Sequence, residues 1–192
     1  MQKALIQVIF VFLLTSLCNS VSAQSKNKEK EDFKADRIKW YSFEDAYQLN
    51  KKKNKQKKIF IDVFTEWCGW CKKMDMDTFT NPVIIEYMNK TFVCVKLDAE
   101  RKDTVIIDNH TFVNPNPNNK RSTHELAVQL LQGRMSYPSY VFLKESSAPL
   151  GILPGYLPPK EFEIWLHYFG EGAYEDQVTF DEFKGSFVGE VK

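Results

Sequence analysis

The stretch "TEWCGWCKKM", residues 65–74, places two cysteines three positions apart, with one tryptophan before them and another between them. A Cys-x-x-Cys pair can be half of a zinc site, a structural disulfide, or a dithiol that exchanges with the disulfides of other proteins. The rest of the chain decides among these three kinds of site.

Zinc and a structural disulfide both fit the sequence poorly. A structural zinc site takes four ligands, and Cys68 and Cys71 could supply two of them. The other two would have to come from Cys94, His110, His124 and His167. These four residues do not show the spacing that is typical of a zinc site. A permanent Cys68–Cys71 bridge would close a very short loop and would remove little chain entropy. An exchanging dithiol is therefore favoured.

The position of the pair supplies a reason for reactivity. Residues 58–64, "KIFIDVF", form a nearly continuous apolar run typical of a central strand buried on both faces. A helix is predicted to begin at the cysteines, so Cys68 would meet unpaired backbone N–H groups and the positive end of the helix dipole. Both stabilise a thiolate, which is the form of cysteine that attacks a disulfide.

Strand and helix patterns alternate through the rest of the chain. Ser42 and Asn81 are predicted to cap helices, and Ser122 with Glu125 predicts a capping box. Strand patterns occupy 58–64, 91–98 and two segments within 139–156, and helix patterns follow the caps and Pro158-Pro159. This order predicts an α/β sandwich with a central mixed β-sheet flanked by helices, over residues 37–170.

Two segments extend this minimal domain. An insertion at about 101–121 contains a predicted hairpin, "TVIIDNHTFV", and the turn-rich loop "NPNPNNKR". A C-terminal extension, 171–192, contains "TFDEFKGSF", which we expect to form a short helix packed on the domain.

The N-terminus has the pattern of a secretory signal peptide. Lys3 precedes an apolar run that is too short for a membrane span. Small residues then form a cleavage-site pattern that ends at Ala23, so we interpret residues 1–23 as a removed signal peptide. An uncleaved anchor and a lipidated Cys18 are the alternatives. Residues 24–36 are polar and charged, which is typical of a flexible linker. These features predict a periplasmic or secreted protein with no membrane span after signal removal.

The charge balance limits the partners of the mature chain. The full chain has 26 basic and 25 acidic residues, and removal of the signal takes one lysine, so the balance is near zero. No nucleic-acid partner is therefore expected. The mature chain keeps three cysteines, Cys68, Cys71 and Cys94, which is an odd number and too few for a disulfide-stapled scaffold.

Taken together, these motifs resemble the thioredoxin superfamily over roughly residues 40–170. "FIDVFTEWCGWCKKM" is similar to its active-site segment, in which a strand carrying an acid leads into W-C-x-x-C-K. Asp62 matches the family's buried acid and Lys96 its neighbouring lysine, while Tyr137-Pro138 matches the cis-proline before the third core strand. Gly155 resembles the glycine after the last strand. The central dipeptide, Gly69-Trp70, departs from the Gly-Pro of thioredoxin itself.

The resemblance implies a catalytic set of four residues and a role for three of them. Cys68 would be the nucleophile, and Cys71 would resolve the mixed disulfide by attacking the Cys68 sulfur. Asp62 would relay the proton that Cys71 loses; the alternative is a carboxylate simply paired with Lys96. These four residues, Cys68, Cys71, Asp62 and Lys96, are the candidate catalytic set.

The resemblance also implies a substrate-contact surface. The backbone beside Pro138 would pair with an extended substrate segment, and tryptophan rings would surround the sulfurs. For Trp70, ordinary packing is an alternative. The candidate contact residues are Trp67, Gly69, Trp70, Tyr137 and Pro138. Cys94, in mid-strand, is expected to be an inert core thiol.

We therefore expect an exported thioredoxin-like protein-disulfide reductase that uses no bound cofactor and no metal. Its partners would be disulfide-containing exported proteins and an electron-donor protein. A disulfide oxidase or isomerase is the alternative within this class. A thioredoxin-fold binding or chaperone module with little turnover is the alternative from another class.

Overall fold

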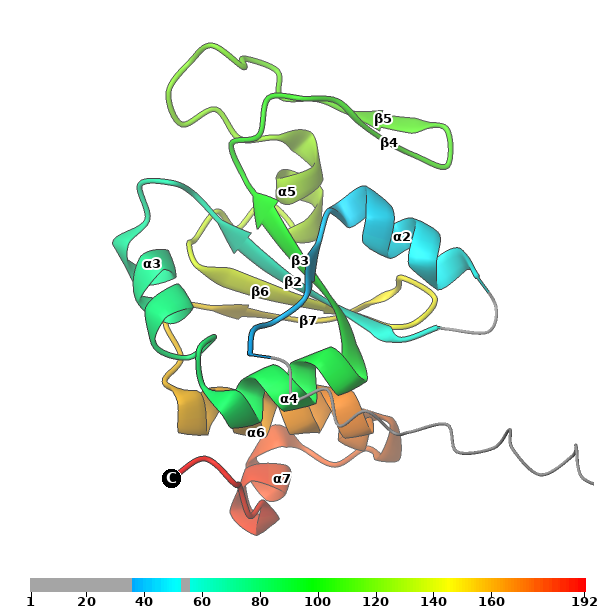
Figure 1. Cartoon of the computed structure of the whole chain (residues 1–192). Coiled ribbons are helices and arrows are strands. Elements are labelled where there is room, and N and C mark those ends of the chain that lie inside the picture. The colour runs from blue at the N-terminus through cyan, green and yellow to red at the C-terminus, as the bar shows by residue number, and fades with distance from the viewer. Residues whose placement is uncertain (1–35, 53–55) are drawn as a thin grey trace, which may run out of the picture. The chain divides into compact units, whose positions relative to one another are not determined.

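Five strands form a mixed sheet in the computed structural model, which describes residues 36–52 and 56–192 (Figure 1). The strand order is β1-β3-β2-β6-β7. The strands are β1 (Trp40–Tyr41), β2 (Lys58–Phe64), β3 (Phe92–Asp98), β6 (Ser139–Leu143) and β7 (Pro149–Pro154). The signal peptide predicted for 1–23, and the linker predicted for 24–36 apart from Asp36, lie outside the described residues.

Strand β2 occupies the centre of the sheet, as its apolar sequence predicts. It pairs in parallel with β3 and antiparallel with β6. Its five central residues are buried, because both faces of the sheet are covered by helices. Asp62 interrupts this apolar run, and it lies opposite Lys96 on β3 and Tyr140 on β6.

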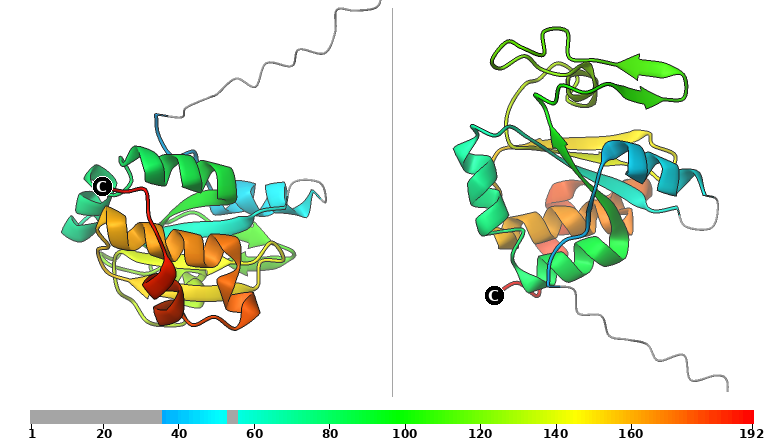
Figure 2. Two further views of the ribbon diagram at one scale, coloured as in Figure 1. Left: turned by 90° about the horizontal axis from the view of Figure 1, so that it is seen from below. Right: turned by 45° about the horizontal axis from the view of Figure 1, so that its top comes forward.

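Two hydrophobic clusters cover the two faces of the sheet, and helices lie on both sides of it (Figures 1 and 2). Helices α2 (Phe43–Lys51) and α5 (Glu125–Leu130) pack on one face. On the other face lie α3 (Gly69–Met76), α4 (Pro82–Thr91) and α6 (Pro159–Glu171). Phe60 anchors this second cluster, where its ring lies within 6.4 Å, centroid to centroid, of six other aromatic rings. The predicted α/β sandwich with a mixed sheet is confirmed.

The helix starts follow the predicted caps with one exception. The Ser42 hydroxyl accepts the Asp45 N–H, and Asn81 Oδ1 accepts the N–H groups of Val83 and Ile84. The capping box predicted at Ser122 is wrong, because the Ser122 hydroxyl donates instead to Asn114 Oδ1 (2.6 Å). His124 caps α5 in its place.

The insertion forms the predicted hairpin, with strands β4 (Val105–Ile107) and β5 (His110–Phe112) in a separate two-stranded sheet. Val105 and Phe112 are buried in the same cluster as α2 and α5. The hairpin is therefore joined to the core, and the loop that follows it starts from a fixed point.

The C-terminal segment also packs on the domain. A short 3₁₀ helix, η1 (Ala173–Asp176), leads to α7 (Phe180–Ser186). The Phe180 ring stacks on Trp165 of α6, and Thr179 and Glu182 form a reciprocal capping box. Among residues 36–52 and 56–192, no helix is both long and apolar enough to cross a membrane.

Candidate redox site

The two cysteines of the motif form a disulfide at the start of α3. The bond between the Sγ atoms of Cys68 and Cys71 is 2.07 Å long. Cys68 is the N-cap residue of α3, and its Sγ accepts the backbone N–H of Cys71 at 3.0 Å. In the reduced protein the same N–H and the helix dipole would favour negative charge on Cys68.

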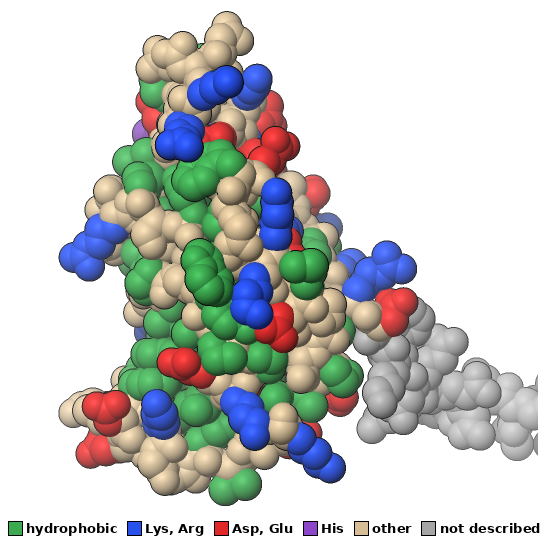
Figure 3. All heavy atoms as spheres, turned by 90° about the vertical axis from the view of Figure 1, so that its left-hand side faces the viewer, with side chains coloured by type: hydrophobic (Ala, Val, Ile, Leu, Met, Phe, Trp, Pro, Cys, Tyr) green, Lys and Arg blue, Asp and Glu red, His purple; other side chains and the backbone are tan. Residues whose placement is uncertain are grey.

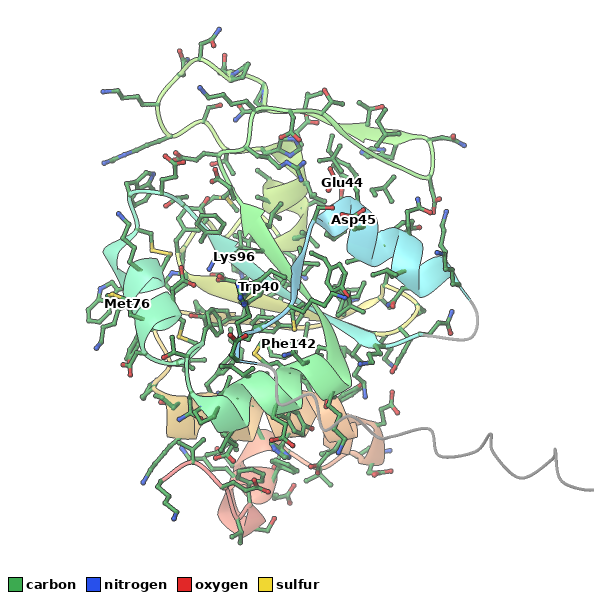
Figure 4. The ribbon with its side chains drawn as sticks, viewed as in Figure 1. Trp40, Glu44, Asp45, Met76, Lys96 and Phe142 are labelled. Atoms are coloured by element: carbon green, nitrogen blue, oxygen red, sulfur yellow. A yellow bond between two sulfur atoms is a disulfide. The ribbon has the colours of Figure 1, made fainter. Side chains whose placement is uncertain are left out.

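Each tryptophan of the motif contacts a tyrosine from another part of the chain. Tyr137 lies just before β6, and Tyr156 lies just after β7. Trp67 meets Tyr137 edge-to-face, with centroids 5.9 Å apart, and Trp70 lies 5.6 Å from Tyr156. Trp67 and Trp70 are 51% and 56% exposed, whereas Cys68 and Cys71 are buried. The side of the molecule that carries α3 therefore presents large apolar side chains, among them Met76, between charged residues (Figures 3 and 4).

The remaining predicted contact residues have distinct backbone features. The Tyr137–Pro138 peptide bond is cis, as the resemblance implied. Gly69 is the first residue of α3, and a Cβ built there would meet no heavy atom within 4 Å. Packing therefore does not require glycine at position 69. Tyr156 is a member of the site that sequence reasoning missed, although it directly follows the glycine noted at position 155.

Lys96 is shared by two carboxylates. Its Nζ lies 3.4 Å from Asp62 Oδ2 and makes a hydrogen bond to Asp75 Oδ1. The ammonium group also lies over the ring of Trp40 at 5.1 Å (Figure 4). The Asp62–Lys96 pair was expected from the sequence, but Asp75, one turn beyond Cys71 on α3, was not.

The negative charge of Asp62 is only partly balanced by the groups around it. Its side chain is 3% exposed, and Oδ1 has no hydrogen-bond partner in the described structure. Burial raises the pKa of Asp62 to about 7, because it penalises the charged form more than the nearby Lys96 favours it, and Asp75 raises it further. Tyr140 is paired with Asp62 across the sheet, and its hydroxyl is also buried without a hydrogen-bond partner among the described residues. Asp62 can therefore hold or release a proton near neutral pH.

Cys94 lies in the core, as expected. It is 1% exposed, and burial raises the pKa of its thiol well above the usual range. A neutral, inaccessible thiol neither attacks disulfides nor binds metal. Among residues 36–52 and 56–192, no group of three or more His, Cys, Asp or Glu side chains could hold a metal ion.

The insertion reaches the site through Trp67. The indole N–H of Trp67 donates to Glu100 Oε1 at 2.8 Å, and the guanidinium carbon of Arg121 lies 5.0 Å from the centre of the Trp67 ring. Sequence reasoning missed both contacts, since Glu100 and Arg121 lie 33 and 54 positions from Trp67 (100 − 67 and 121 − 67) and show no motif of their own.

These features define a thioredoxin-fold protein with a Cys-x-x-Cys disulfide at a helix start, which fits thiol–disulfide oxidoreductase chemistry. The family Thioredox_DsbH, described as "Protein of unknown function, DUF255", matches residues 21–169. The chain belongs to this family.

Individual known proteins are also similar to parts of this chain. Spermatogenesis-associated protein 20 of Mus musculus is 35% identical over 77 residues, which are 40% of this chain and 10% of the mouse protein. The chain thus spans about a tenth of that relative's length. A thioredoxin from Thermus thermophilus superposes with a TM-score of 0.53 at 18% identity, over 74% of this chain and 98% of that one. A thioredoxin-fold protein from Helicobacter pylori gives a TM-score of 0.51, also at 18% identity, over 68% and 79% of the two chains. These two structures support the fold.

Proposed function

We propose that this protein reduces protein disulfides outside the cytosol through the Cys68/Cys71 dithiol. The observation that carries the proposal is the position of Cys68 at the N-cap of α3, where a backbone N–H already points at its sulfur. The pairing of Asp62 with Lys96 and the W-C-G-x-C-K motif are closest to the reducing members of the superfamily, which supports the direction of the reaction.

The reaction has two displacement steps. The Cys68 thiolate attacks one sulfur of the substrate disulfide, and the other substrate sulfur leaves as a thiolate that takes a proton from water. The Cys71 thiol then transfers its proton to Asp62 and attacks Cys68 Sγ, which releases the second substrate sulfur. The substrate gains two electrons, and the protein is left with the disulfide seen in the structure.

Turnover requires that this disulfide be reduced again. The proposed partners are therefore of two kinds: exported proteins with disulfides, as substrates, and a dithiol protein that donates electrons. The half-exposed Trp67 and Trp70 would contact the substrate beside the sulfurs, together with Gly69 and the backbone at Tyr137 and Pro138.

The direct test is reduction of insulin by the purified chain, with dithiothreitol as the electron donor. We expect the wild type to precipitate the insulin B chain faster than dithiothreitol alone. Cys68→Ser should fall to that background rate, while Cys94→Ala, a matched removal of a thiol outside the site, should retain activity. Full activity of Cys68→Ser would overturn the mechanism. A wild type without activity that instead oxidises reduced clients would favour the oxidase alternative.

A further inference from the structure

The insertion places a cation on the tryptophan that precedes the nucleophile. Arg121 stacks on one face of Trp67, while the edge-to-face contact with Tyr137 and the hydrogen bond to Glu100 hold the same indole ring. Trp67 is adjacent to Cys68, and Tyr137 precedes the cis-proline. Arg121 therefore contacts Trp67, which the proposed function places against the substrate.

The loop that carries Arg121 is held in place by a buried side chain. Asn114 is 7% exposed, and its Nδ2 donates to the carbonyls of Arg101 (3.1 Å) and Ser122 (2.8 Å). Its Oδ1 accepts from the Ser122 hydroxyl and from the N–H of Asn116. Between these fixed points Arg121 has a φ of 62°, a left-handed conformation that is unfavourable for a residue other than glycine. The hydrogen bonds of Asn114 thus fix the loop on both sides of this unfavourable conformation.

The charge of Arg121 is not neutralised within the described part of the chain. No carboxylate there lies within 4.0 Å of its guanidinium group. Glu100, the acid that shares Trp67 with Arg121, is already engaged by the indole N–H. A carboxylate brought by a substrate would find a free guanidinium there, next to an aromatic surface that excludes water from part of it.

We propose that Arg121 selects substrates in which an acidic side chain lies beside the cysteine that Cys68 attacks. This inference rests on the proposed function, since it concerns the same sulfur exchange. It assigns the insertion a role in choosing disulfides: acidic flanking residues are attracted, and basic ones are repelled. The step affected is formation of the mixed disulfide.

The test uses synthetic peptides whose single cysteine is held as a 2-pyridyl disulfide. Attack by reduced Cys68 on the peptide sulfur forms the mixed disulfide and releases pyridine-2-thione, which is followed by its absorbance. The peptides differ only in a Glu, Gln or Lys placed next to the cysteine or one residue away. We expect the wild type to react with the best Glu peptide roughly three to ten times faster than with the Lys peptide at low salt.

Three variants decide whether Arg121 is the cause. Arg121→Ala should lower the Glu/Lys rate ratio to about twofold or less, and Arg121→Glu should invert the preference. Lys120→Ala removes the same charge from the neighbouring exposed residue and should leave the ratio unchanged. Thermal unfolding of each variant shows that it is folded.

The outcomes separate this inference from the proposed function. An equal ratio in wild type and Arg121→Ala, or an equal loss in Lys120→Ala, would overturn the role of Arg121 while thione release still supported exchange at Cys68. Absence of thione release from every peptide would overturn the proposed function, and this inference with it.

Discussion

The Lys96 ammonium lies between Asp62 on β2 and Asp75 on α3, and it contacts Asp75 more closely. One positive charge therefore serves two negative ones, and the buried member, Asp62, is left with an unpartnered oxygen. A buried carboxyl in this position favours its neutral form. The proton-relay role proposed for Asp62 depends on this incomplete compensation.

The first prediction concerns the pH dependence of stability. The native pKa of Asp62, about 7, lies above its ordinary value of 3.8. The native state therefore binds more protons than the unfolded state between these values, and Asp62 makes the protein less stable as pH rises through that window. Asp62→Asn removes this loss. The free energy of unfolding of the variant, relative to that of the wild type, should therefore rise by on the order of 2–4 kcal/mol as the pH increases from 4 to 8.

Urea unfolding of the oxidised wild type and variant at pH 4, 6 and 8 measures this difference. Oxidised protein keeps the Cys68–Cys71 bond constant across the series. A difference that stays flat from pH 4 to pH 8 would show that Asp62 titrates as an ordinary carboxyl, and would remove the physical basis of its proposed relay role.

The second prediction concerns Asp75. Asp75→Asn removes the carboxylate that engages Lys96 and leaves the ammonium free to approach Asp62. The pKa of Asp62 should therefore move below that of the wild type, because an unshared cation favours its charged form. Carboxyl-carbon NMR of Asp62 measures the titration directly.

Asp77→Asn is the matched control for Asp75. Asp77 lies two positions further on, at the C-cap of α3, where it contacts Lys73 and Tyr156 and not Lys96. The Asp62 titration should be unchanged in this variant. A shift in Asp77→Asn as large as that in Asp75→Asn would mean that the general field of α3, and not the shared lysine, sets the behaviour of Asp62.

At the scale of elements, helix α6 holds the C-terminal residues through one buried carboxylate. Glu163 is 2% exposed, and its oxygens accept the backbone N–H groups of Glu190 (2.6 Å) and Val191 (3.1 Å). A carboxylate that accepts two backbone hydrogen bonds fixes the path of the segment that donates them.

The third prediction is that Glu163→Ala releases this segment. Hydrogen exchange should become faster at the amides of Glu190 and Val191, with a loss of about 1–2 kcal/mol in the free energy of unfolding. Glu161→Ala, which removes an exposed acid in the first turn of the same helix, serves as the control: it should leave the exchange unchanged and lower the free energy of unfolding by less. Unchanged exchange in Glu163→Ala would show that other contacts hold the segment.

The elements were largely predictable from sequence because their signals are local. The apolar run of β2, the Asn81-Pro82 start of α4 and the hairpin at 104–113 all depend on neighbouring residues. The cap of α5 was not predictable in the same way. The Ser122–Glu125 spacing matched a capping box, but the Ser122 hydroxyl is used by Asn114, eight residues earlier in the chain.

At the scale of the whole molecule, the site likewise contains residues that local sequence signals reveal and residues that only tertiary contacts bring in. Cys68 and Cys71 could be predicted from their motif, and the Asp62–Lys96 pair from the resemblance to the thioredoxin superfamily. Asp75, Arg121 and Glu100 join the site only through tertiary contacts, and no spacing in the sequence links them to it. The residues that join the site through tertiary contacts are thus the ones that need the structure.

The central claim is that Cys68 attacks protein disulfides and Cys71 resolves the product. It is tested most directly by expressing Cys71→Ser, with its own N-terminal segment, in the organism that encodes it. Because the resolving thiol is absent, mixed disulfides should accumulate, and proteins should be recovered that reductant releases from Cys68. Cys68→Ser should recover few, since Cys71 lies within α3 and lacks the N-cap position that favours a thiolate on Cys68. A folded Cys71→Ser protein that carries no covalent partner would contradict the account and favour a binding module of thioredoxin fold.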